Sequence, residues 1–126
     1  MNQMKRYLII LPMIVLAACY KDNKEDMYGS GPGAGCDTTN VTYATTIQPL
    51  LQSKCATSGC HNAASSSAGI NLSNHSGAKA IADNGFFLRV IRHESGVAPM
   101  PQGGAKLDDC TIAQIQKWVN DGAPNN

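Results

Sequence analysis

The sequence predicts a small all-α domain that follows an N-terminal targeting segment. Apolar residues recur at helical spacing in four separate segments between residues 36 and 126, and no segment alternates apolar and polar residues as a half-buried strand does. Glycine, proline and asparagine lie between these segments and mark long loops. The roughly 90 residues involved form a single domain whose apolar core is marginal at that size.

The first helix is expected over residues 43–54, with Tyr43, Ile47 and Leu51 on its apolar side. Pro49 lies within this run and is expected to kink the helix or to mark a second start. Residues 69–72 are expected to form a short extended piece. Residues 77–83 are expected to form a short helix that ends at Asn84.

The last two helices are also expected from apolar spacing. One carries Phe86, Phe87, Val90 and Ile91. The other begins at a cap on Asp108 or Asp109, ends before Gly122, and carries Ile112, Ile115, Trp118 and Val119.

Residues 1–18 are expected to be a signal peptide. Lys5 and Arg6 precede an apolar run of 12 residues, which is too short for a bilayer core that needs about 20. The run ends in Leu-Ala-Ala-Cys at residues 16–19, which resembles the lipobox of bacterial lipoproteins. That resemblance implies cleavage before Cys19 and acylation of this cysteine, so that lipid anchors the chain. A plain secretory signal with a chance cysteine is the alternative.

Residues 19–35 are charged and then glycine-rich, which predicts a flexible tether between the lipid and the domain. The charged cluster after Cys19 resembles an export tag of lipoproteins. We therefore expect a protein of the cell envelope of a Gram-negative-type bacterium, held at the outer membrane on its periplasmic or surface face. The membrane is thus an expected partner through the lipid anchor.

The charge balance argues against nucleic acid as a partner. From residue 36 onward the chain has six basic and six acidic residues, so it presents no basic footprint. The sequence also lacks a Ser/His/Asp set, a convincing carboxylate pair and a phosphate loop, so we expect no enzyme.

Residues 55–61 read Cys-Ala-Thr-Ser-Gly-Cys-His and carry the chemistry of this chain. Two nearby cysteines, the second followed directly by histidine, are typical of covalent attachment of haem c. Cys55 and Cys60 would form thioethers with the porphyrin, and His61 would be the proximal iron ligand. The usual spacer is two residues, and here it is four. A structural disulfide between Cys55 and Cys60 is the alternative, and zinc is a poorer one because no second ligand pair exists.

The remaining cysteines predict a disulfide. With Cys19 assigned to lipid and Cys55 and Cys60 to haem, Cys36 and Cys110 are left, and exported proteins rarely keep free thiols. Without haem, the four domain cysteines would allow three pairings.

Met100 is the expected second axial ligand. It lies between Pro99 and Pro101, which restrict the backbone, and a thioether is a suitable ligand for haem iron. His93 is the alternative distal ligand and His75 a weaker one, each otherwise an ordinary polar residue. The sequence therefore predicts a metal-binding, iron-containing protein with one haem.

The order of these motifs resembles a class I (cytochrome c-like) domain over residues 36–126. The shared features are Ile-x-Pro-Leu-Leu at residues 47–51, Met-Pro-x-Gly-Gly at 100–104 and Ile-x-x-Trp-Val-x-x-Gly-Ala at 115–123. The resemblance implies about four short helices around one covalent haem, with Tyr43 and Trp118 where the first and last helices cross.

The resemblance implies single-electron transfer with redox partner proteins at the membrane. Two alternatives stay open. Met100 could dissociate to give a haem-based ligand sensor or a peroxidase-like centre, or the chain could be a haem-free, disulfide-bridged surface lipoprotein module. The oligomeric state has no signature in the sequence.

Overall fold

The computed structural model of the protein describes residues 35–126. The expected signal peptide, the lipid-bearing Cys19 and the expected tether up to residue 34 lie outside the described residues. Within residues 35–126 the structure contains helices and no strand, which confirms the all-α prediction for this part of the chain. The elements are η1 (Tyr43–Ile47), α1 (Gln48–Lys54), η2 (Ser67–Gly69), α2 (His75–Asp83), α3 (Phe86–Ile91) and α4 (Asp109–Asn120).

The expected first helix is present as two consecutive pieces. The π-helical turn η1 begins after Thr42, whose hydroxyl accepts a hydrogen bond from the Thr45 amide. Helix α1 follows directly, with Pro49 in its first turn, where the missing proline amide is not needed for a helical hydrogen bond. Pro49 therefore marks a second start, one of the two outcomes expected for it.

Helix α2 begins two residues earlier than expected. The Asn74 side chain accepts a hydrogen bond from the Gly77 amide and caps the helix, so that His75 is its first residue. Residues 67–69 form the 3₁₀ turn η2, and an extended backbone begins at Ile70, one residue later than expected. Helix α3 follows α2 after a two-residue turn at Asn84 and Gly85.

Helix α4 has the expected limits. Asp108 caps it by accepting hydrogen bonds from the Thr111 amide and hydroxyl, and these bonds lower the pKa of the Asp108 carboxyl. A disulfide joins Cys110, in the first turn of α4, to Cys36, with 5.3 Å between their Cα atoms. The structure thus contains the expected Cys36–Cys110 pairing.

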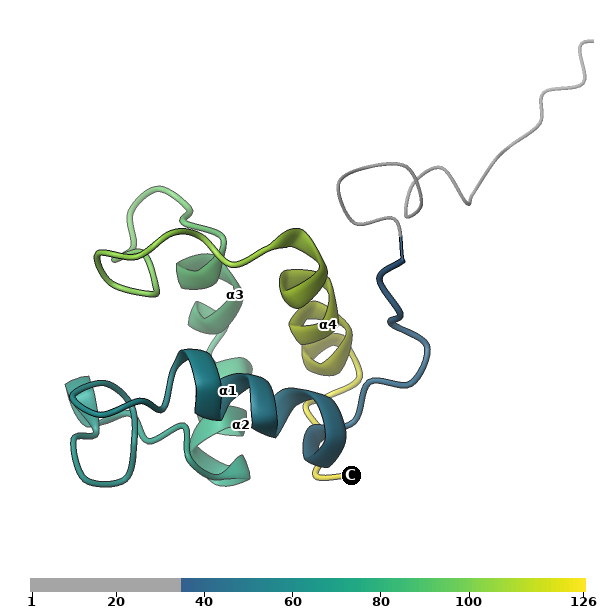
Figure 1. Ribbon diagram of the computed structural model, residues 1–126, viewed down its shortest axis with the longest axis horizontal. Coiled ribbons are helices and arrows are strands. Elements are labelled where there is room, and N and C mark those ends of the chain that lie inside the picture. Colours follow the sequence, from purple (N-terminus) through teal and green to yellow (C-terminus); the bar gives the residue numbers. More distant parts are fainter. Residues whose placement is uncertain (1–34) are drawn as a thin grey trace, which may run out of the picture.

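The core lies where η1, which continues into α1, meets α4, and where α3 packs against α2 and α4 (Figure 1). Trp118 and Tyr43 contact at the η1–α4 junction, with 5.8 Å between ring centroids, as expected. The indole of Trp118 is fully buried and donates to the Pro124 carbonyl oxygen. The other large, fully buried side chains are Ile47, Leu51, Ile91 and Ile115.

No helix within residues 35–126 is both long enough and apolar enough to cross a membrane.

Candidate functional site

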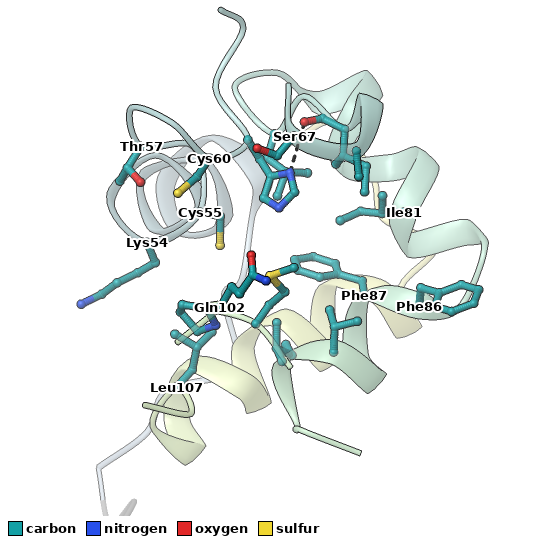
Figure 2. A pocket seen from close by; sticks show the side chains of 18 of the residues that line it. Lys54, Cys55, Thr57, Cys60, Ser67, Ile81, Phe86, Phe87, Gln102 and Leu107 are labelled. Carbon is teal, nitrogen blue, oxygen red and sulfur yellow. Dashed lines mark hydrogen bonds between the residues drawn. The ribbon is translucent and has the colours of Figure 1, made fainter. Parts of the chain in front are cut away.

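A cavity of about 760 Å³ lies beside the core, a size typical of sites for small molecules and cofactors. One wall is the end of α1 and the loop after it, and the opposite wall is α3 with the segment before α4 (Figure 2). Apolar side chains dominate the surface: Ile70, Leu72, Ile81, Phe86, Phe87, Val90, Ile91 and Leu107 all line it. Cys55, Cys60, His61 and Met100 line the same cavity.

The loop at residues 55–61 is closed by its own backbone. Cys55 ends α1, and its carbonyl oxygen accepts a hydrogen bond from the His61 amide at 3.1 Å. Within the loop the Cys60 amide donates to the Thr57 carbonyl oxygen at 3.0 Å. Gly59 has a φ of +79°, a left-handed conformation that glycine adopts without strain. The four-residue spacer therefore folds as a compact turn that returns Cys60 to the cavity.

The two thiols have different environments. Cys55 is half-buried and Cys60 is exposed, and both are free in the structure. The Cys55 sulfur points into the cavity, across from Phe87 and Gln102 (Figure 2). Burial, with a smaller contribution from Cys60, raises the pKa of the Cys55 thiol to about 11. The structure thus contains no disulfide between Cys55 and Cys60.

The His61 ring is oriented by a backbone carbonyl group. Its Nδ1 lies 3.3 Å from the carbonyl oxygen of Ile70, which can only accept a hydrogen bond, so Nδ1 carries the hydrogen. The His61 carbonyl oxygen in turn accepts from the Leu72 amide at 2.7 Å. In a neutral ring the lone pair is therefore on Nε2, and a hydrogen-bonded Nδ1 is the usual partner of an Nε2 metal ligand.

Met100 reaches the cavity from a loop that contains no helix. Its amide donates to the carbonyl oxygen of Val90, near the end of α3, at 2.9 Å. Met100, Pro101 and Gln102 all line the cavity. The structure thus brings the expected distal ligand to the same cavity as His61.

The other two histidines do not line the cavity. His93, the alternative distal ligand, lies 3.1 Å by its Nε2 from the Met100 carbonyl oxygen. The Nε2 of His75 lies 2.9 Å from the Ala123 carbonyl oxygen, and its ring stands edge-on to Tyr43 with 4.8 Å between centroids. Both rings are thus held by protein acceptors.

The structure corrects the expectation of metal binding by the protein itself. Within the described part of the chain, no three or more His, Cys, Asp or Glu side chains form a group that could hold a metal ion. The description of this domain as metal-binding and iron-containing through its own side chains is therefore wrong. The physical reason is placement: a metal held by protein alone needs three or four donors close together. Cys55, Cys60 and His61 line one cavity, but their side chains do not form such a group.

Sequence reasoning missed the groups that orient the expected ligands. The carbonyl groups of Ile70 and Val90 and the ring of His93 fix His61 and Met100. A backbone carbonyl occurs at every residue and leaves no signal in a sequence. The apolar wall formed by α3 could be predicted from the sequence, because Phe86, Phe87, Val90 and Ile91 follow helical spacing.

Charge is nearly absent from the cavity. Among residues 35–126, Lys54 is the one charged residue that lines it, and its side chain points away from the cavity (Figure 2).

Comparisons of this chain with protein-family models, curated proteins and solved structures found no match.

Proposed function

We propose that this domain carries one covalently attached haem c and serves as a single-electron carrier. The observation that carries the proposal is the convergence of Cys55, Cys60, His61 and Met100 on one apolar cavity. These residues come from two segments, 55–61 and the loop at 100, that are distant in the sequence. A haem-free domain held together by its disulfide would not require these four side chains to meet at one cavity.

The residues fit a haem group by chemistry and by space. Cys55 and Cys60 offer two thiols for the thioether bonds, and the cavity of about 760 Å³ has an apolar surface suited to a porphyrin. His61 would be the proximal ligand through Nε2, and Met100 the distal ligand through its thioether. When bound, the haem supplies an iron that changes between ferrous and ferric states. The fold that such a group would complete is the cytochrome c-like arrangement of short helices.

The side chains around the cavity would tune that iron. A Met/His ligand pair and an apolar environment both raise the reduction potential of haem. The Nδ1–carbonyl contact of His61 holds the ring orientation, so that little rearrangement would accompany electron transfer. His61 and Met100 together would leave the iron no open position for a substrate, and we therefore propose a carrier and no enzyme.

We propose further that the carrier works at the membrane, tethered through Cys19 and residues 20–35. Six basic and six acidic residues after residue 35 leave no net charge for long-range steering. A tether raises the local concentration of redox partner proteins at the same surface and can replace steering.

Absorption spectra of the mature chain, produced with c-type haem maturation machinery, test the proposal. We expect reduced c-type bands that survive acid-acetone extraction, a porphyrin-sized mass increase, and loss of both in Cys55→Ser/Cys60→Ser. Met100→Ala should lose the weak ferric sulfur-to-iron band, whereas Met27→Ala, a methionine outside residues 35–126, should keep it. A colourless wild-type protein, or full haem loading of the double cysteine variant, would refute the proposal.

A further inference from the structure

Both peptide groups of Met100 are held by α3 and the residues directly after it. The Met100 amide donates to the Val90 carbonyl oxygen at 2.9 Å, and the Met100 carbonyl oxygen lies 3.1 Å from His93 Nε2. The His93 amide donates to the same Val90 carbonyl oxygen at 3.3 Å. Val90 and Met100 line the cavity, while His93 stands behind them. The loop from 93 to 100 is therefore closed at its base.

The backbone of His93 is bent for this contact. Its φ is +58°, in the left-handed region that few residues other than glycine, asparagine, aspartate and histidine occupy. Helix α3 ends at Ile91, and the left-handed residue two positions later turns the chain at the start of this loop. Because the Met100 carbonyl oxygen can only accept a hydrogen bond, the donated hydrogen lies on Nε2 of His93. Both the neutral ring and the imidazolium can donate from this atom.

We propose that His93 is a positioning residue, whose hydrogen bond to Met100 keeps the thioether side chain in the cavity wall. His93 therefore acts through Met100 and does not itself bind iron. The inference rests on the proposed function for its consequence at iron: the hydrogen bond limits how often the Met100 sulfur would leave the metal. It disfavours the open distal position that a ligand sensor needs.

Two variants separate the hydrogen bond from the shape of the ring. His93→Phe keeps a planar ring and removes the donor, whereas His93→Gln keeps an amide donor of similar reach. Neither residue favours a positive φ, so backbone strain affects both variants. Glu94→Gln is the matched control, because Glu94 is exposed and its side chain pairs with Arg89 and Arg92.

The first readout is hydrogen exchange of the Met100 amide in the haem-free protein. Losing one hydrogen bond predicts roughly 2- to 12-fold faster exchange in His93→Phe. His93→Gln and Glu94→Gln should stay near the wild-type rate. Unchanged exchange in His93→Phe, or exchange in His93→Gln as fast as in His93→Phe, would overturn the proposal.

The second readout is carbon monoxide binding to the ferrous, haem-loaded protein, together with the sulfur-to-iron band of the ferric form. His93→Phe should bind carbon monoxide roughly 2- to 12-fold faster, and His93→Gln should restore the wild-type rate. The band should weaken only as far as the Met100-bound fraction falls. Equal behaviour of wild type and His93→Phe would overturn the role at iron. If the wild type attaches no haem, the proposed function fails, and amide exchange alone decides whether His93 holds Met100.

Discussion

The perturbed thiol of Cys55 predicts that the haem-free protein loses stability in alkali. In the unfolded chain this thiol ionises near its ordinary pKa of 9.0, while in the folded protein the pKa is raised to about 11. The stabilising contribution is therefore fully present below pH 9 and is lost as the pH rises through 11. The difference between the two pKa values corresponds to about 3 kcal/mol in the free energy of unfolding.

Urea unfolding between pH 8 and 12 measures this loss, with oxygen excluded and the Cys36–Cys110 disulfide intact. Lysines and tyrosines ionise in the same range, so the informative quantity is the pH dependence of wild type minus that of Cys55→Ala. Cys60→Ala is the matched control, because Cys60 is exposed and contributes only the smaller share of the shift.

The same pKa predicts slow alkylation of Cys55. At pH 8 the thiolate fraction in the folded state should be about 100-fold below that of the unfolded chain, and iodoacetamide should react correspondingly slowly. An alkaline loss of equal size in wild type and Cys55→Ala would refute burial as the cause. Haem attachment converts the thiol to a thioether that cannot ionise, so a loaded protein should show no such difference.

Two further predictions concern the scaffold around the cavity. Gly77→Ala should destabilise the protein by about 1–3 kcal/mol in urea unfolding, because a Cβ at Gly77 would lie 1.7 Å from the Asn71 carbonyl oxygen. Ser76→Ala is the control, since Ser76 is exposed. Equal stability of the two variants would contradict the close approach of Gly77 to Asn71. Replacing both Cys36 and Cys110 with alanine should lower the free energy of unfolding by about 4 kcal/mol in the chain-entropy account, since the bridge spans 74 residues; a loss below about 1 kcal/mol would show that the disulfide does little to restrict the unfolded chain.

Local signals explain why α4 could be predicted from sequence. Its cap depends on Asp108 and Thr111, three residues apart, and its end on Gly122, whose φ is +89°. The π-helical start of the first helix could not be predicted in the same way. The amides of Tyr43 and Ala44 donate to Asn126, at the far end of the sequence, and no local pattern encodes that contact.

In the candidate site too, some residues could be predicted from local sequence and others depend on contacts that only the fold creates. Residue type and spacing pointed to Cys55, Cys60, His61 and Met100, because thiols, imidazole and thioether are the groups that haem chemistry uses. The role of His93 depends instead on a contact of its ring with a backbone carbonyl group seven residues along the chain. Its sequence signature was that of an alternative ligand, and the structure places it behind the cavity wall.

The backbone hydrogen bonds indicate that the cavity is shaped before any group enters it. The His61 amide is bound to Cys55 and its carbonyl group to Leu72, while Met100 is bound through both of its peptide groups. Loops held in this way lose little conformational entropy when their side chains bind a cofactor, which favours binding. The longer cysteine spacer is compatible with such order because the extra residues form a turn that leaves Cys60 beside His61. Breaking one of these backbone hydrogen bonds should therefore increase the motion of the His61 or Met100 side chain while the fold stays intact.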